Sequence, residues 1–123
     1  MNKVNPFLYQ NIDNSNYWII SEIILNQCKH HPNKKIIQFA DGPEWSFDDL
    51  KNIAFEKAKI LEDLSLKQGD TVTVMVDDPI DFIPYWIASS FLGVMFVALN
   101  TALKGSVLLH QIKIGRASCR ERV

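Results

Sequence analysis

Two runs of β-branched and apolar residues constrain the fold of this chain more than any other feature. They are residues 71–76 and 94–99, and a helix-patterned segment separates them. Such runs are typical of strands that are buried on both faces. A strand, a helix and a strand within about thirty residues make a βαβ unit, whose crossover is right-handed and whose strands are parallel neighbours. The sequence therefore predicts the α/β class, with a central parallel strand at 71–76.

The segment between the two runs allows two interpretations. Apolar residues at helical spacing after Asp78 predict a helix that ends before Gly93, although Pro84 should bend it or move its start to a later residue. The stretch between Asp81 and Lys104 is also uncharged, and it is long enough to span a bilayer. Because Gly93 separates a half of helical period from a β-branched half, we expect a helix and a strand and no membrane span.

The remaining segments also alternate between helix and strand. The apolar spacing predicts a helix over residues 17–31, and Pro32 ends it. Residues 35–40 and 44–46 should pair as a hairpin around a turn at 41–43. Ser46 and Asp49 form an acidic variant of the capping box, which predicts a helix to about Leu64. A last helix should begin near Ser106. The fold class is therefore α/β, with a β-hairpin and a βαβ unit of an incomplete parallel sheet.

Composition excludes several classes of protein. The chain has 123 residues, of which 47% are hydrophobic, and this is enough for one globular core. Its net charge of −1 gives no reason to expect a nucleic acid as partner. Cys28 and Cys119 lie far apart and lack metal-ligand spacing, so neither a disulfide framework nor a zinc site is predicted. No signal peptide precedes the first helix, and a cytoplasmic location is expected.

No residue pattern in the chain predicts a chemical site. The five glycines are isolated and form no phosphate-binding loop. His30 and His31 should interact with a helix end, His110 should lie at the surface or in packing, and an Asp group at 77, 78 and 81 should cap a helix. Three tryptophans are expected in the core: Trp18, Trp45 and Trp86. We therefore predict no catalytic, no cofactor-binding and no metal-binding residue in this chain.

The last ten residues, 114–123, differ in composition from the rest. All three arginines of the chain lie among them, at Arg116, Arg120 and Arg122. One permitted codon for each residue gives ATCGGAAGAGCGTCGTGTAGGGAAAGAGTG, which resembles an adapter used in short-read sequencing. A basic tail that binds phosphate is the alternative. We predict that residues 113–123 are a non-native read-through tail, and we exclude them from the reasoning on function.

The order of short motifs along the chain resembles the start of the AMP-binding, or adenylate-forming, synthetases. The motifs are residues 29–32 (KHHP), 39–42 (FADG), 44–50 (EWSFDDL), 69–76 (GDTVTVMV), 79–82 (PIDF), 92–93 (LG) and 97–100 (VALN). Residues 99–105 (LNTALKG) and 108–111 (LLHQ) are similar to acyl-CoA ligases of the crotonobetaine/carnitine and fatty-acid-transport types. Asp78, Val94 and Ala98 depart from residues that are frequent in the family, which leaves the subfamily open.

This resemblance implies that the parent protein is an acyl-CoA synthetase. Such a ligase activates a carboxylic acid with ATP and Mg²⁺ to an acyl-adenylate, and then transfers the acyl group to coenzyme A. The resemblance places the catalytic motifs after Ile112, so no functional residue is carried over to this chain, and the fragment itself should be inactive. It also divides the chain into a lead-in (1–16), an N-terminal fragment of the AMP-binding domain (17–112) and the tail.

A small stand-alone α/β domain that binds a partner without catalysis is the alternative to the ligase fragment. For the ligase fragment we expect poor solubility when it is expressed alone, because two strands of the buried type would lack most of their sheet. The sequence does not indicate the acyl substrate or the oligomeric state.

Overall fold

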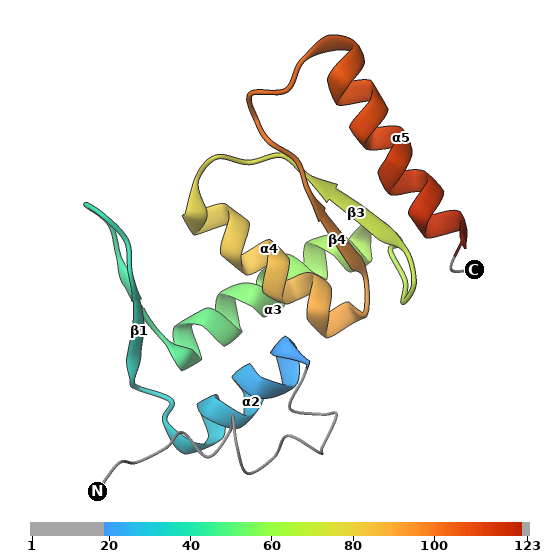
Figure 1. Ribbon diagram of the computed structural model, residues 1–123. Helices are drawn as coiled ribbons and strands as arrows, with labels where there is room; N and C mark the ends of the chain where they lie inside the picture. The colour runs from blue at the N-terminus through green and yellow to red at the C-terminus, as the bar shows by residue number, and fades with distance from the viewer. Residues whose placement is uncertain (1–18, 122–123) are drawn as a thin grey trace, which may run out of the picture.

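The chain folds into alternating helices and strands, as the sequence predicts (Figure 1). The computed structural model describes the backbone of residues 19–121 and the side chains of residues 19–114. The elements, in order, are α2 (Ile20–His30), β1 (Lys35–Gln38), β2 (Glu44–Ser46), α3 (Phe47–Asp63), β3 (Thr71–Val74), α4 (Pro79–Leu92), β4 (Met95–Ala98) and α5 (Gly105–Glu121). The predicted α/β class is confirmed.

The βαβ unit consists of β3, α4 and β4. The two strands are parallel, and their register runs from Thr71 opposite Met95 to Val74 opposite Ala98. This confirms the predicted parallel pair. The sheet has two strands in the described part of the chain, so β3 has a strand neighbour on one side only. The burial of β3 is one-sided within residues 19–121, because Val74 is buried whereas Thr73 on the opposite face is exposed.

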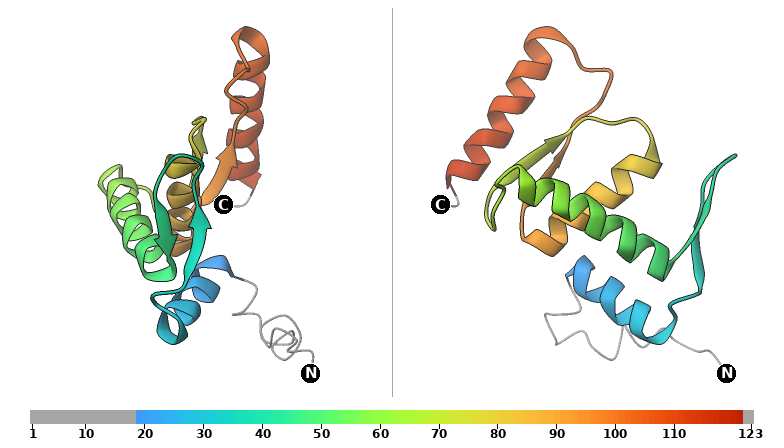
Figure 2. Two further views of the ribbon diagram at one scale, coloured as in Figure 1. Left: turned by 90° about the vertical axis from the view of Figure 1, so that its left-hand side faces the viewer. Right: turned by 180° about the vertical axis from the view of Figure 1, so that it is seen from behind.

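Helices lie on both faces of the β3–β4 pair. Seen from the side in Figure 2, α3 and α4 lie on one face and α5 on the other. α2 packs against both α3 and α4. The main core fills the space between these three helices and the hairpin, and it contains Ile24, Cys28, Phe39, Trp45, Leu50, Ala54 and Ile87. A smaller cluster of Ala58, Leu61 and Ala88 connects α3 and α4 to Val72 of β3. The core therefore lies on one side of the strand pair.

The predicted hairpin is formed by β1 and β2, which pair antiparallel. Asp41 in the turn has φ 54°, a left-handed conformation that Asp adopts more readily than most residues. Phe39 and Trp45 are buried, and their rings pack edge to face with their centroids 4.5 Å apart. Trp45 therefore lies in the core, as predicted. Trp18 lies outside the described residues.

The prediction for Trp86 is wrong, because this side chain is 43% exposed. The inner face of α4 carries the fully buried Pro84, Ile87 and Ser89, and Trp86 lies on another face of the helix. Pro84 does not move the start of the helix, which begins at Pro79. α4 ends at Gly93, whose φ of 68° places it in the left-handed region that favours glycine.

The capping box of α3 is present as predicted. The backbone N–H of Asp49 donates to Ser46 Oγ at 3.1 Å, and the backbone N–H of Ser46 donates to Asp49 Oδ2 at 2.9 Å. These two bonds satisfy donors that the first turn of a helix leaves without partners. The start of α3 is thus determined by local sequence.

The uncharged stretch 82–103 divides between α4 and β4, as expected. Within residues 19–121, no helix is both long and apolar enough to cross a membrane. The last helix, α5, extends past Ile112 and includes residues 114–121.

Candidate functional site

Open α/β sheets bind ligands at the carboxyl ends of their strands, which here are the ends of β3 and β4. Because α4 and α5 lie on opposite faces of this parallel pair, its carboxyl edge is a topological switch point, where α/β proteins bind their ligands. Asp77 and Asp78 follow β3, and Asn100 and Thr101 follow β4. The tertiary structure therefore brings together polar residues that are more than twenty positions apart in sequence.

These polar groups bond to one another and to the nearby backbone. Thr101 Oγ1 donates a hydrogen bond to Asp77 Oδ1, which joins the two loops. Asn100 Oδ1 accepts from the backbone N–H of Ala102 at 2.9 Å. Asp78 Oδ1 accepts from the backbone N–H of Ile80 at 3.0 Å and caps α4, as predicted for this acidic group. The bonds shape the two loops and leave Asp81 as a first-turn acid on α4.

The N-terminus of α4 does not suit a phosphate group. A helix N-terminus binds anions through its free N–H groups and its dipole. Here the carboxylate of Asp78 already accepts one of those N–H groups, Pro79 lacks an N–H, and Asp81 adds a second negative charge. Gly42, Gly69 and Gly93 lie in separate loops, and Gly105 is the first residue of α5. The α4 N-terminus therefore offers no free anion site.

The histidines do not come together in a site. His30 and His31 are exposed at the end of α2, with ring centroids 6.4 Å apart. His30 lies in the last turn of α2, where a helix dipole favours cationic groups. His110 is exposed on α5. Among the described residues, no three His, Cys, Asp or Glu side chains gather as metal ligands would.

Cys28 is the one thiol in the described part of the chain, and it is buried in the core. Its Sγ lies 3.1 Å from the carbonyl oxygen of Phe47 and donates to it. Burial raises the pKa of this thiol above its usual value, and the nearby charge of Lys51 opposes that rise only in part. A thiol with a raised pKa is a poor nucleophile. Cys28 is part of the main core.

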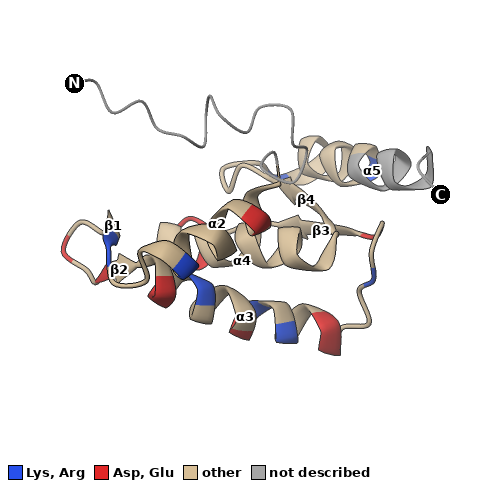
Figure 3. Cartoon of the chain, turned by 90° about the horizontal axis from the view of Figure 1, so that it is seen from below, with Lys and Arg blue, Asp and Glu red and all other residues tan. Residues whose placement is uncertain are grey.

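Figure 3 shows that α3 carries positively and negatively charged residues along its length. Lys51 pairs with Asp48 at 3.0 Å, and this hydrogen bond raises the pKa of Lys51. Lys35 of β1 lies 3.6 Å from Asp49. Both signs of charge occur along the helix, which is typical of a solvated surface and not of a site for one charged partner.

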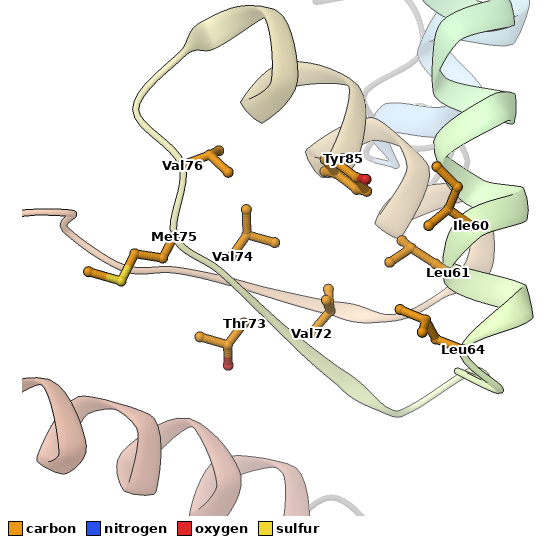
Figure 4. A pocket seen from close by; sticks show the side chains of 9 residues that line it. All are labelled: Ile60, Leu61, Leu64, Val72, Thr73, Val74, Met75, Val76 and Tyr85. Atoms are coloured by element: carbon orange, nitrogen blue, oxygen red, sulfur yellow. The ribbon is translucent and has the colours of Figure 1, made fainter.

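An apolar concavity lies beside β3 (Figure 4). It is an open groove of about 300 Å³, here called the edge groove, and its lining residues come from α3, β3 with the residues that follow it, and α4. They are Ile60, Leu61, Leu64, Val72, Thr73, Val74, Met75, Val76 and Tyr85.

None of the residues that line the edge groove is charged. Figure 4 shows Val72, Val74 and Val76 pointing toward α3 and α4, whereas Thr73 and Met75 point to the other side of the strand. Leu64 is 66% exposed and Ile60 is 43% exposed. Sequence reasoning did not find this groove, because its walls come from three separate segments. The one local signal was the apolar Leu64 at the end of α3, where a polar residue is more usual.

Comparison with known proteins identifies relatives of this chain. The profile of the AMP-binding enzyme family matches residues 24–119. Human long-chain fatty acid transport protein 6 is 30% identical over 90 residues, which cover 72% of this chain and 14% of that protein. The 2-succinylbenzoate–CoA ligase of Oceanobacillus iheyensis is 32% identical over 81 residues, which cover 66% of this chain and 17% of the ligase.

A solved structure shows the same fold. The N-terminal subdomain of Klebsiella oxytoca NpsA matches with a TM-score of 0.73 at 14% identity, over 80% of this chain and 26% of that one. The chain thus spans about a sixth of the length of the two relatives named above.

Proposed function

Because the chain belongs to the AMP-binding enzyme family, we propose that it is the N-terminal part of the large domain of an ATP-dependent acyl-CoA ligase. The whole enzyme would join a small carboxylic acid to AMP, release pyrophosphate, and pass the acyl group to the thiol of coenzyme A. Its cofactors would be ATP, Mg²⁺ and coenzyme A. The family match over residues 24–119 is the observation that carries this proposal.

Within that enzyme, residues 19–112 serve as scaffold. The side chains that could take part in chemistry already have structural tasks: Asp78 caps α4, Asp77 bonds to Thr101, and Cys28 is buried. The nucleotide, metal and coenzyme A would be held by residues outside this part of the chain. The fragment itself is therefore proposed to be inactive.

The handedness of the βαβ unit supports a larger sheet. α4 lies on one face of the strand pair and α5 on the other. The right-handed crossover through α4 leads from β3 to β4. A right-handed crossover through α5, on the other face of the sheet, leads from β4 back past β3. A parallel strand that followed α5 would therefore lie at the outer edge of β3, where the edge groove is open. This arrangement favours a part of a larger domain over a stand-alone one.

Exposed apolar side chains on other elements support the same choice. α5 exposes Val107 (54%), Leu109 (53%) and Ile112 (36%). A domain that functions alone rarely leaves so many large apolar groups uncovered. For the complete enzyme we propose a cytoplasmic location, which the two widely spaced cysteines favour.

The first test measures carboxylate-dependent exchange between ATP and labelled pyrophosphate with the purified chain. We expect no exchange above the buffer blank, with a complete acyl-CoA ligase as positive control. Exchange that depends on an added carboxylic acid would contradict the scaffold role.

The second test is a chimera with the 2-succinylbenzoate–CoA ligase of Oceanobacillus iheyensis. Residues 24–112 of this chain would replace the matching segment of that ligase. We expect the chimera to form the CoA thioester, because the exchanged segment supplies scaffold. The same chimera carrying Ile87→Asp, which places a charge in the core, is the control and should be inactive. A folded but inactive chimera without that substitution would count against the proposal.

A further inference from the structure

A hydrogen bond between two side chains joins the loops that follow β3 and β4. Thr101 Oγ1 donates to Asp77 Oδ1, across 24 positions of the sequence. The strands bring the loops to this point, because the backbone N–H of Leu99, just after β4, donates to the carbonyl oxygen of Val74 at 2.9 Å. Figure 1 shows the two chain segments close together where they leave the strands. The bond therefore connects the carboxyl ends of both strands beyond their backbone pairing.

The Thr101 side of this bond is held by a turn. The backbone N–H of Leu103 donates to the carbonyl oxygen of Asn100 at 3.1 Å, which closes a β-turn over residues 100–103. The side-chain Oδ1 of Asn100 accepts from the backbone N–H of Ala102 at 2.9 Å, so an Asx turn supports the same segment. The hydroxyl group of Thr101 therefore extends from a backbone that is already ordered.

The Asp77 side is held by the start of α4. Asp77 directly precedes Asp78, whose carboxylate caps the helix by accepting from the backbone N–H of Ile80 at 3.0 Å. The carbonyl oxygen of Asp78 also accepts from the N–H of Phe82 at 3.0 Å. The bond to Thr101 thus connects the N-terminus of α4 to the turn that leads into α5.

We propose that Asp77 and Thr101 are positioning residues for the ligand site of the complete enzyme, an inference that rests on the proposed ligase function. α4 and α5 lie on opposite faces of the strand pair, so the bonded loops border the topological switch point, where open α/β sheets bind their ligands. Neither side chain needs to touch the substrate. The bond keeps the two loops in one arrangement before a ligand arrives, so that binding has less of the protein to order.

This positioning role differs from a role in global stability. The bond is exposed to solvent, and neither partner belongs to the main core. Loops can open locally while the rest of a protein stays folded, so their local order can be lost at little cost to global stability. Loss of the bond should therefore loosen the two loops and leave the melting temperature unchanged.

The first measurement is amide hydrogen exchange in the complete 123-residue chain. Thr101→Val keeps the size of the side chain and removes the hydroxyl donor. We expect it to raise the exchange rate of the Leu103 amide about tenfold, as for the loss of a hydrogen bond to a charged group. The Leu99 amide is the internal reference and should change little, because it pairs with β3. Thr101→Ser retains a hydroxyl group and should restore most of the protection. An unchanged rate at Leu103 in Thr101→Val would overturn the proposal.

The second measurement uses the chimeric Oceanobacillus iheyensis ligase that carries residues 24–112 of this chain. Thr101→Val in this chimera should lower kcat/KM for thioester formation about tenfold to a hundredfold, because small displacements near a ligand site cost that much. Thr101→Ser should recover most of the activity. Thr73→Val is the matched control, because it makes the same change on an exposed threonine of β3 and should leave kcat/KM unchanged.

An unchanged kcat/KM for Thr101→Val in an active chimera would overturn the proposal. So would a loss that Thr101→Ser does not reverse, or a loss accompanied by a lower melting temperature, since either result would show a packing role. A chimera that is inactive without any of these substitutions counts against the ligase function itself. Amide exchange at Leu103 in the 123-residue chain then decides whether Asp77 and Thr101 hold the two loops together.

Discussion

The two outer helices, α2 and α5, have similar apolar patterns but very different surroundings. α2 buries Ile24 and Cys28 against α3 and α4, at 6% and 8% exposure. α5 contacts β3 but leaves Leu109 53% exposed and Ile112 36% exposed. Figure 1 shows α2 close to α3 and α4, and α5 at the outside of the strand pair.

This difference shows that an amphipathic pattern predicts a helix but not the surface that covers it. The energy of burial depends on the apolar area removed from water, and that area is large for α2 and small for α5. α2 should therefore contribute to the stability of the isolated chain, whereas α5 should contribute little.

The largest effect is expected from a matched pair of substitutions in the two helices. Ile24→Ala in α2 should lower the free energy of unfolding by about 3 kcal/mol, because it leaves a cavity in the core. Ile112→Ala in α5 should lower it by less than about 1 kcal/mol, because that side chain is exposed. Urea denaturation measures both. Equal effects would mean that α5 is covered in solution and would break the comparison.

Gly93→Ala tests whether the strand pair depends on the end of α4. Gly93 has φ 68°, and an added Cβ would lie 2.9 Å from Cγ of Gln68, a flexible side chain that can move. The cost is therefore mainly conformational, about 1 to 2 kcal/mol. Thermal melting measures it, and Gly93→Asn is the control, since Asn tolerates this conformation better and should lose less. An unchanged melting temperature for Gly93→Ala would contradict the role of Gly93 as helix terminator.

Ser46 is both the last residue of β2 and the N-cap of α3. Ser46→Ala tests how much this cap stabilises the fold. Loss of the side-chain cap should cost about 1 kcal/mol. Ser46→Thr retains a hydroxyl group and should recover part of the loss. Chemical denaturation of both variants checks this, and a neutral Ser46→Ala would mean that water replaces the cap.

The smallest expected effect is a pH dependence that Asp49 causes. Hydrogen bonds from Ser46, first from its backbone N–H, hold the pKa of Asp49 below its usual 3.8. The folded state then binds fewer protons than the unfolded state. The contribution is complete above the usual pKa of Asp and is lost as the pH falls through the lowered pKa. Acid titration of stability measures this, and Asp49→Asn should show a smaller loss over that range. Equal acid sensitivity of the two proteins would contradict this origin.

Much of the fold was predictable because its signals are local. The capping box at Ser46 and Asp49, the turn at 41–43 and the proline after α2 each act within a few residues of the chain. The βαβ unit was also predictable, because β-branched runs and a helical segment follow one another with Gly93 between them. Trp86 was not, since helical spacing does not show which neighbouring element an apolar side chain will meet.

The candidate site was less predictable than the fold. The sequence contains no phosphate-loop pattern, and the tertiary structure adds that the carboxylate of Asp78 caps the N-terminus of α4. The edge groove could not be predicted, because it depends on how α3 lies against β3 and on which edge of β3 is paired with β4. Neither the packing of α3 on β3 nor the choice of paired edge can be predicted from a local sequence pattern.

The sequence by itself determined the order of the helices and strands, the caps that start and end them, and the α/β class. These follow from interactions among residues close in the chain, where periodicity and hydrogen bonding to nearby backbone decide the conformation. Only the tertiary structure decided that α2 buries Ile24 and Cys28, that Trp86 and Leu109 are exposed, and that an apolar groove lies between α3, β3 and α4. Burial depends on contacts between segments distant in sequence, and those contacts exist only after the elements have packed.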